Sequence, residues 1–465
     1  MRGQHSGASA GGRRIMVASF IGTAIEFYDF YVYATAAALV FGPLFFPAAS
    51  PAAQLLSSFA TFSIAFIARP LGAALFGHFG DRVGRKSTLV ASLLIMGLST
   101  MLVGLLPTYA QAGYAAPLML ALLRFGQGIG LGGEWGGAAL LAVENAPEGK
   151  RGWYGMFPQL GAPIGFIAAN GMFLTLALLL SDQDFRQWGW RLPFLLSALL
   201  VILGLYVRLK LTETPAFRRA LAEAPPPRVP LGLLLRRYPR DTVLGTLSMI
   251  ACYVLFYLAT VFALGYGTLT LGYPRSLFLA VQCVAIIFMT VGIPTAAWLS
   301  DRYGRRPVLL WSIGATAASS LLIAPMLGSG SLPVIAVFLC VQLFIMGLIF
   351  GPMGALLPEL FPTPVRYTGA SVTYNIGSIL GASFAPFLAQ LLASWGGLPW
   401  VGGYLFIAAA ISFVAIALMR ETGGRGAVRW PEDGLTGGGT ATGAGSPLPS
   451  MAPLAQSAAQ PEGMP

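Results

Sequence analysis

Charged residues are what this sequence has least of. Only 10% of its 465 residues are Asp, Glu, Lys or Arg, whereas 56% are hydrophobic and the mean hydropathy is +0.73. A soluble protein carries about 25% charged residues. Too little charge is present to cover a soluble protein of this length. The composition therefore predicts an all-α polytopic membrane protein with almost the whole chain in the bilayer.

Cysteine and histidine are also scarce. The three cysteines, Cys252, Cys283 and Cys340, lie in apolar segments at spacings that fit no metal site, and His5 and His78 are the only histidines. The sequence has no phosphate-binding loop and no HExxH zinc motif. It therefore predicts no enzyme, no metal site and no ATP site of its own. Protons are expected as the coupling ion, with no other cofactor.

Twelve apolar runs are long enough to cross a bilayer, which takes about 20 residues as a helix. The first run shows no cleavage site, so it is not expected to be a removable signal. The runs are residues 15–41, 53–76, 88–107, 114–143, 152–178, 191–208, 242–268, 276–298, 307–328, 332–357, 367–393 and 399–419. The predicted organisation is a lead at 1–14, six-helix halves at 15–208 and 242–420, a central loop at 209–241 and a disordered tail at 421–465.

The positive charge is unevenly placed. The net charge is +11, and most of the 28 Lys and Arg residues fall in the lead, in alternate loops and in the tail. Cytoplasmic segments of membrane proteins carry such an excess. This placement predicts a multi-pass protein of the cytoplasmic (inner) membrane with both termini in the cytoplasm. The partner of the basic segments is then the lipid bilayer, and no nucleic acid is expected.

Two short motifs occur once in each half. The motif DR-x-GR-[KR] begins at Asp81 after the second run and at Asp301 after the eighth. The motif E-x-x-P-x-x-x-R begins at Glu144 after the fourth run and at Glu359 after the tenth. Two independent motifs that recur in the same order indicate an internal duplication.

Two six-helix halves with DR-x-GR-[KR] after the second helix of each resemble the major facilitator superfamily over residues 13–420. Three segments are similar to its metabolite:proton symporter family, namely EFYDF at 26–30, ARPLGA at 68–73 and RFGQGIGLGGEWGGA at 124–138. That family includes permeases for shikimate, α-ketoglutarate, citrate, dicarboxylates, and proline with glycine betaine. The resemblance implies two helical halves that rock about a central cavity, which opens to each side in turn.

The charged residues of the repeated motifs are expected to form a gate. Asp81 and Asp301 fall where a carboxylate can cap a neighbouring helix, and the arginines can pair with acids across the seam between the halves. Such pairs would hold the cytoplasmic side shut, although the arginines could instead only set the topology. The predicted gating residues are Asp81, Arg82, Arg85, Glu144, Arg151, Asp301, Arg302, Arg305, Glu359 and Arg366.

Five charged residues lie well inside the predicted spans, all in the first half: Glu26, Asp29, Arg69, Arg124 and Glu134. An ion at membrane depth costs at least ~2.5 kcal/mol, so it is read as functional by default. Glu26 and Asp29 are three residues apart and share a helix face. Two close carboxylates cannot easily both ionise, so one should exchange protons near neutral pH. We predict Glu134 as the proton-coupling residue, followed by Asp29 and Glu26.

The segment 124–138 combines polar and small residues. Gln127 and Glu134, seven apart, lie on one helix face. Gly128, Gly132 and Gly136 repeat at four-residue spacing, which lets another helix backbone approach closely. The segment is thus either a packing helix with a buried ion pair or one wall of a solute or proton site, and we favour the second interpretation.

The two in-membrane arginines are candidates for holding a substrate carboxylate. Arg69 could instead be a structural partner of Glu26 or Glu134. The other residues expected at the cavity wall are Tyr33, Gln127, Gln159, Tyr253, Tyr257, Gln282, Gln342, Tyr374 and Asn375. Any of these could instead satisfy a kinked helix backbone. Together they indicate hydrogen bonding to a hydroxylated or carboxylated molecule.

The sequence therefore predicts a secondary transporter that couples uptake of a small organic acid, shikimate- or dicarboxylate-like, to inward proton movement as a monomer. The first alternative is a proton symporter for proline or betaine, because a zwitterion also offers a carboxylate to an arginine. A drug:proton antiporter is opposed by the incomplete glycine–proline motif GAPIG at 161–165. A membrane sensor is opposed by the lack of a signalling domain.

Overall fold

The computed structural model describes residues 5–47, 50–83, 85–132, 135–210, 230–362 and 365–424. Within these ranges the regular structure is entirely helical, as the composition predicts. The described residues all belong to one compact unit, residues 1–428.

The first half contains six long helical segments joined by short connections. Its elements are α1 (His5–Ala36), η1 (Ala37–Phe41), α2 (Gly42–Phe45), α3 (Pro51–Val83), α4 (Arg85–Val103), α5 (Tyr109–Ala112), α6 (Ala115–Leu131), α7 (Trp135–Glu144), α8 (Arg151–Leu179), α9 (Asp182–Gln187), η2 (Gly189–Arg191) and α10 (Leu192–Lys210).

The second half repeats this arrangement with more interruptions of the helices. Its elements are α12 (Pro230–Arg237), α13 (Pro239–Ser248), α14 (Ile250–Tyr257), η3 (Leu258–Phe262), α15 (Ala263–Gly265), η4 (Tyr266–Thr270), α16 (Arg275–Tyr303), α17 (Arg305–Ser320), η5 (Ile323–Leu327), α18 (Leu332–Glu359), α19 (Arg366–Ser378), η7 (Ile379–Ser383), α20 (Ala385–Gly396) and α21 (Leu398–Leu418).

Each of the twelve predicted spans corresponds to a helical segment. Among the described helices, ten are long and apolar enough to cross a membrane. In the third span, the part of α4 whose side chains are described is the shorter apolar helix Val90–Val103. The ninth span falls short because α17 ends at Ser320, and a separate π-helical turn, η5, follows it.

Part of the predicted central loop is helical. Within residues 209–241, α12 occupies Pro230–Arg237, and α13 already begins at Pro239. Leu234 of α12 is fully buried, whereas Leu231 and Leu235 are exposed. The predicted loop therefore contains a short helix that its polar composition did not indicate. The side of this helix that carries Leu234 packs against the second half.

Close helix packing in the first half depends on glycine. A Cβ atom at Gly128 would overlap the backbone of Ala65, and one at Gly132 would overlap the carbonyl oxygen of Arg69. Two of the three regularly spaced glycines, Gly128 and Gly132, therefore pack directly against the backbone of α3. The third, Gly136, faces Ser371 of α19 in the second half.

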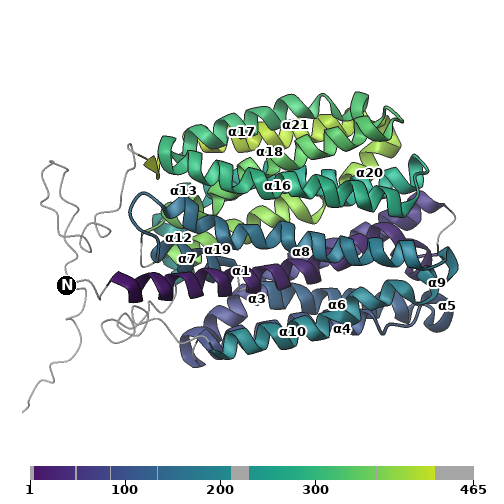
Figure 1. Ribbon diagram of the computed structural model, residues 1–465, viewed down its shortest axis with the longest axis horizontal. Helices are drawn as coiled ribbons and strands as arrows, with labels where there is room; N and C mark the ends of the chain where they lie inside the picture. Colours follow the sequence, from purple (N-terminus) through teal and green to yellow (C-terminus); the bar gives the residue numbers. More distant parts are fainter. Residues whose placement is uncertain are drawn as a thin grey trace, which may run out of the picture. The chain divides into compact units, whose positions relative to one another are not determined.

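The two halves lie side by side, with α8 packed against α16 and α18 between them (Figure 1). The terminal end of the bundle is defined here as the end where α1 begins and α21 ends, and the far end is the opposite one. The halves meet in the middle, where Gln159 Nε2 donates to the carbonyl oxygen of Phe350 at 2.9 Å. They also meet at the far end, where Arg275 pairs with Asp182 at 2.6 Å.

Candidate functional site

Two buried arginines lie inside a cluster of aromatic rings in the first half. Arg124 of α6 is fully buried, and Arg69 of α3 is 7% exposed. The guanidinium of Arg124 lies over the rings of Phe30, Tyr33 and Phe62, at 4.6, 4.0 and 4.9 Å from their centroids. These rings attract the cation through their electron-rich faces.

Phe30 of α1 joins the two arginines. The Arg69 guanidinium lies 5.0 Å from the centroid of the same ring and 4.6 Å from that of Phe66. Tyr257 of the second half packs edge-on against Phe62 and Phe66, with centroids 5.4 and 6.0 Å apart. The two arginines predicted for substrate binding therefore lie in one aromatic cluster of the first half. Tyr257 of the second half covers this cluster.

The three predicted proton-coupling carboxylates have different surroundings. Asp29 accepts a hydrogen bond from the Ser197 hydroxyl of α10, which packs on α1 and α4 of its own half. Glu26 of α1 is buried, with 6% of its surface exposed. Glu134 lies outside the described residues, so its predicted role stays a prediction.

A separate group of polar and aromatic side chains connects the two halves. The indole of Trp135 stacks on Tyr374 with a centroid distance of 3.7 Å and an interplanar angle of 7°. Trp135 Nε1 donates to Gln159 Oε1 at 3.0 Å. Tyr253 packs edge-on against Tyr374 at 5.7 Å. Three predicted wall residues, Gln159, Tyr253 and Tyr374, thus meet around Trp135, which the sequence analysis did not single out.

The remaining predicted wall residues lie at different places in the bundle. Tyr33 shares a hydrogen bond of 2.7 Å with Thr61 beside Arg124, and Asn375 Nδ2 donates to the carbonyl oxygen of Gly132 across the seam at 3.2 Å. Gln282 accepts from Asn170 Nδ2 at 3.3 Å, towards the far end.

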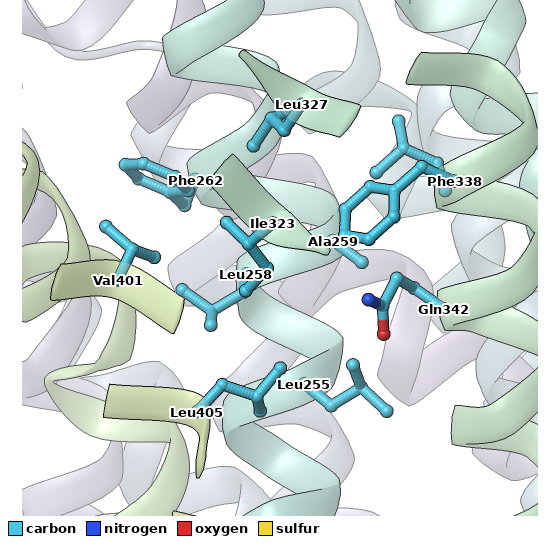
Figure 2. A pocket seen from close by; sticks show the side chains of 11 residues that line it. Leu255, Leu258, Ala259, Phe262, Ile323, Leu327, Phe338, Gln342, Val401 and Leu405 are labelled. Carbon is cyan, nitrogen blue, oxygen red and sulfur yellow. The ribbon is translucent and has the colours of Figure 1, made fainter. Parts of the chain in front are cut away.

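Gln342 lies away from the seam. It accepts from the Ser319 hydroxyl at 3.1 Å within the second half. It also borders a small apolar pocket between η3, η5, α18 and α21, lined mainly by leucine, isoleucine and phenylalanine (Figure 2). The free space in that pocket is about 10 Å³, about the room needed for one water molecule. Gln342 therefore belongs neither to the aromatic cluster around Arg69 and Arg124 nor to the group of side chains around Trp135 and Tyr374.

The second copy of the gate motif forms a charged network at the terminal end. Asp301 accepts from the backbone N–H groups of Gly152 and Trp153 at 2.8 Å each. It therefore caps the first turn of α8 in the other half, the type of contact expected for it. Arg305 pairs with Asp301 at 2.7 Å and grips Glu359 through Nε and Nη2, each at 3.2 Å.

Two residues after the last helix extend this network. The carboxylate of Glu421 accepts from the backbone N–H groups of Arg305 and Arg306 at 2.7 and 3.1 Å. Thr422 donates to Glu359 at 2.9 Å. The predicted tail at 421–465 thus begins with residues that pack against α17. Their contacts could not be predicted from the sequence, because these residues directly precede a Gly- and Pro-rich stretch.

Other predicted gating residues lie apart from this network. Arg302 lies over Trp298 and Tyr303 at 5.7 and 5.5 Å, and Arg366 Nε donates to the Phe361 carbonyl at 3.1 Å. Glu144 is exposed and Arg151 is half-buried. The side chains of Asp81, Arg82 and Arg85 lie outside the described part of the chain, so the first-half gate stays a prediction.

The described residues form two similar helical halves, with two buried arginines in the first half beneath a ring of the second half, an arrangement typical of a membrane transporter. Residues 15–223 match the family model "Sugar (and other) transporter", and residues 283–434 match the model "Major Facilitator Superfamily". The solved structure of the proton:xylose symporter XylE superposes with a TM-score of 0.70 over 90% of this chain and 98% of that one. At 18% identity, this likeness bears on the fold alone.

Relatives at higher identity establish the family. The chain is 56% identical over 414 residues to the "Inner membrane metabolite transport protein YhjE" of Escherichia coli (strain K12), covering 88% of this chain and 94% of that protein. It is 37% identical to the shikimate transporter of the same organism, covering 88% of this chain and 95% of that protein. It is 33% identical to the proline/betaine transporter of Salmonella typhimurium, covering 89% of this chain and 84% of that protein. The chain belongs to the major facilitator superfamily and is one of its metabolite transporters, not an enzyme.

Proposed function

We propose that this protein couples the uptake of a small organic acid to inward proton movement across the cytoplasmic membrane. In this proposal the terminal end of the bundle faces the cytoplasm, as the excess of Lys and Arg there favours. The observation that carries the proposal is the pair of buried arginines, Arg69 and Arg124, that share the ring of Phe30. Two cations at membrane depth favour an anion as the transported solute.

Proton coupling is assigned to the in-membrane carboxylates. Glu26 and Asp29 lie within four residues of Phe30 on α1, and the ring of Phe30 contacts both arginines. Glu134 is retained as the first candidate because it lies in the same segment as Arg124 and Gln127. A carboxylate that loads a proton outside and releases it inside would link the two fluxes.

Gating is assigned to the network at the terminal end. Asp301, Arg305 and Glu359 are tied to α8 of the other half through Gly152 and Trp153. Opening of the cavity towards the cytoplasm must break these bonds. The equivalent residues of the first half, Asp81, Arg82 and Arg85, are proposed to act in the same way.

Transport of proline or betaine is the second candidate. It is favoured by the 33% identity to proline/betaine transporters. A trimethylammonium group binds to the faces of aromatic rings, but the faces of Phe30, Tyr33, Phe62 and Phe66 here lie against guanidinium groups. We therefore place the organic acid first.

Uptake by the purified protein in proteoliposomes tests the proposal. Labelled shikimate, succinate and glycine betaine are offered separately, with an acidic exterior and with equal pH on both sides. We expect accumulation of an organic acid that depends on the pH gradient and is abolished by a protonophore. Accumulation of betaine alone would favour the second candidate.

A further inference from the structure

One edge of the Arg124 guanidinium has no hydrogen-bond partner among the residues that the structure describes. The side chain is fully buried, and within the described part of the chain neither Nε nor Nη2 donates to an acceptor. Nε–H and one N–H of Nη2 point in parallel, so they form an edge that can hold both oxygens of a carboxylate. A buried donor without an acceptor is costly. Arg69 is slightly exposed, and its Nε is likewise buried without an acceptor among the described residues.

The other edge of Arg124 is held in place by a relay. Nη1 donates to Gln127 Oε1 at 3.0 Å, and Gln127 Nε2 donates to the Thr100 hydroxyl of α4 at 2.8 Å. Thr100 donates in turn to the carbonyl oxygen of Met96 at 3.0 Å. The chain of bonds from Met96 to Nη1 fixes the guanidinium plane and directs the vacant edge away from Gln127.

The surroundings of the vacant edge suit an anion better than a zwitterion. Among the described residues, Arg124 forms no salt bridge. A second guanidinium, that of Arg69, lies on the same ring of Phe30. An ammonium group brought here would meet two cations, whereas a carboxylate would be attracted by both.

The geometry points to Arg124 as the residue that grips the carboxylate of the transported acid side-on, through Nε and Nη2, with Gln127 and Thr100 as positioning residues. This inference rests on the proposed function and names the group that recognises the solute. Tyr257 covers the cluster from the second half. Separation of the halves would withdraw this ring and give a solute access to the vacant edge.

Ligand affinities of the full-length purified protein, measured by thermal shift, test this assignment. The probes are shikimate, succinate, citrate and benzoate, each beside its methyl ester. The variants are Arg124→Lys and Gln127→Leu. Arg69→Lys is included for comparison, and Arg275→Lys, at the far end of the bundle, is the matched control. A lysine lacks the planar fork, so Arg124→Lys should weaken binding of the preferred acid by about tenfold, the equivalent of one charge-assisted hydrogen bond, and leave the ester unchanged.

Gln127→Leu leaves Arg124 in place and should also lower the ratio of acid to ester affinity, because the guanidinium is no longer held in plane. This variant decides the matter if Arg124→Lys does not fold. Equal weakening of acid and ester in both variants would make Arg124 structural and overturn the inference. Loss of the acid preference in Arg69→Lys alone would overturn it too, and the proposed function would stand. A wild-type protein that binds no acid better than its ester would overturn both.

Discussion

At the scale of single residues, aromatic rings hold a cation where the membrane would otherwise exclude it. Desolvation of an ion costs several kcal/mol, and each cation–π contact returns about 0.5–2 kcal/mol. Three rings lie within 5 Å of the Arg124 guanidinium. They stabilise the arginine without neutralising it, so its charge remains available to an anion.

Phe30 should matter more than the other rings because it contacts both arginines. Phe30→Leu keeps an apolar side chain but removes two cation–π contacts, whereas Phe62→Leu removes one. We expect Phe30→Leu to lower the thermal unfolding temperature more, by the equivalent of about 1 kcal/mol. An equal or larger loss in Phe62→Leu would show that the shared ring has no special role.

The carboxylates can be separated by comparing two kinds of transport. Glu134→Gln, Asp29→Asn and Glu26→Gln are each reconstituted. Removal of the coupling group should abolish accumulation driven by a pH gradient but leave solute counterflow intact, because exchange needs no net proton transfer. If all three variants still accumulate solute under an imposed pH gradient, coupling through these carboxylates is wrong.

At the scale of helices, much of the architecture could be predicted from hydropathy and glycine spacing. The twelve apolar runs each became helical, and Gly128 and Gly132 receive α3 as the four-residue spacing indicated. The α12 helix was not predicted because its arginines, and the prolines around it in the sequence, are typical of a loop. Trp135 was missed because an aromatic residue in an apolar span looks like packing, and only the fold brings it onto Tyr374.

Glycine substitutions test the helix contact directly. A Cβ at Gly132 would overlap the Arg69 carbonyl, whereas a Cβ at Gly171 meets nothing within 4 Å. Gly132→Ala should therefore destabilise the protein by about 1–3 kcal/mol through overpacking. Gly171→Ala should be neutral or stabilising, since alanine favours a helix. Equal unfolding temperatures of the two variants would contradict the close approach of α3 and α6.

At the scale of the whole molecule, the two ends of the bundle are closed by contacts of different strength. Arg305 and Glu359 are buried, with side-chain exposures of 3% and 5%, and loss of one partner leaves a buried charge. The far-end pair is more exposed, with values of 15% for Arg275 and 84% for Asp182. An exposed ion pair contributes little.

This asymmetry predicts different effects on uptake. Glu359→Gln should strongly reduce the uptake rate, because one of the two carboxylates that balance the buried Arg305 loses its charge. Asp182→Asn should leave uptake close to that of the wild type. Both variants are compared at equal amounts of protein in the membrane. A greater loss in Asp182→Asn would place the controlling contact at the far end.

The most direct test of proton-coupled acid uptake is to record proton and solute movement together. Wild-type protein is reconstituted in vesicles that contain a pH-sensitive dye, without sodium and with equal pH on both sides, and an inward gradient of shikimate or succinate is imposed. The account predicts acidification of the vesicle interior at the rate of acid entry, which a protonophore abolishes. Entry of the acid without any change of internal pH would contradict it.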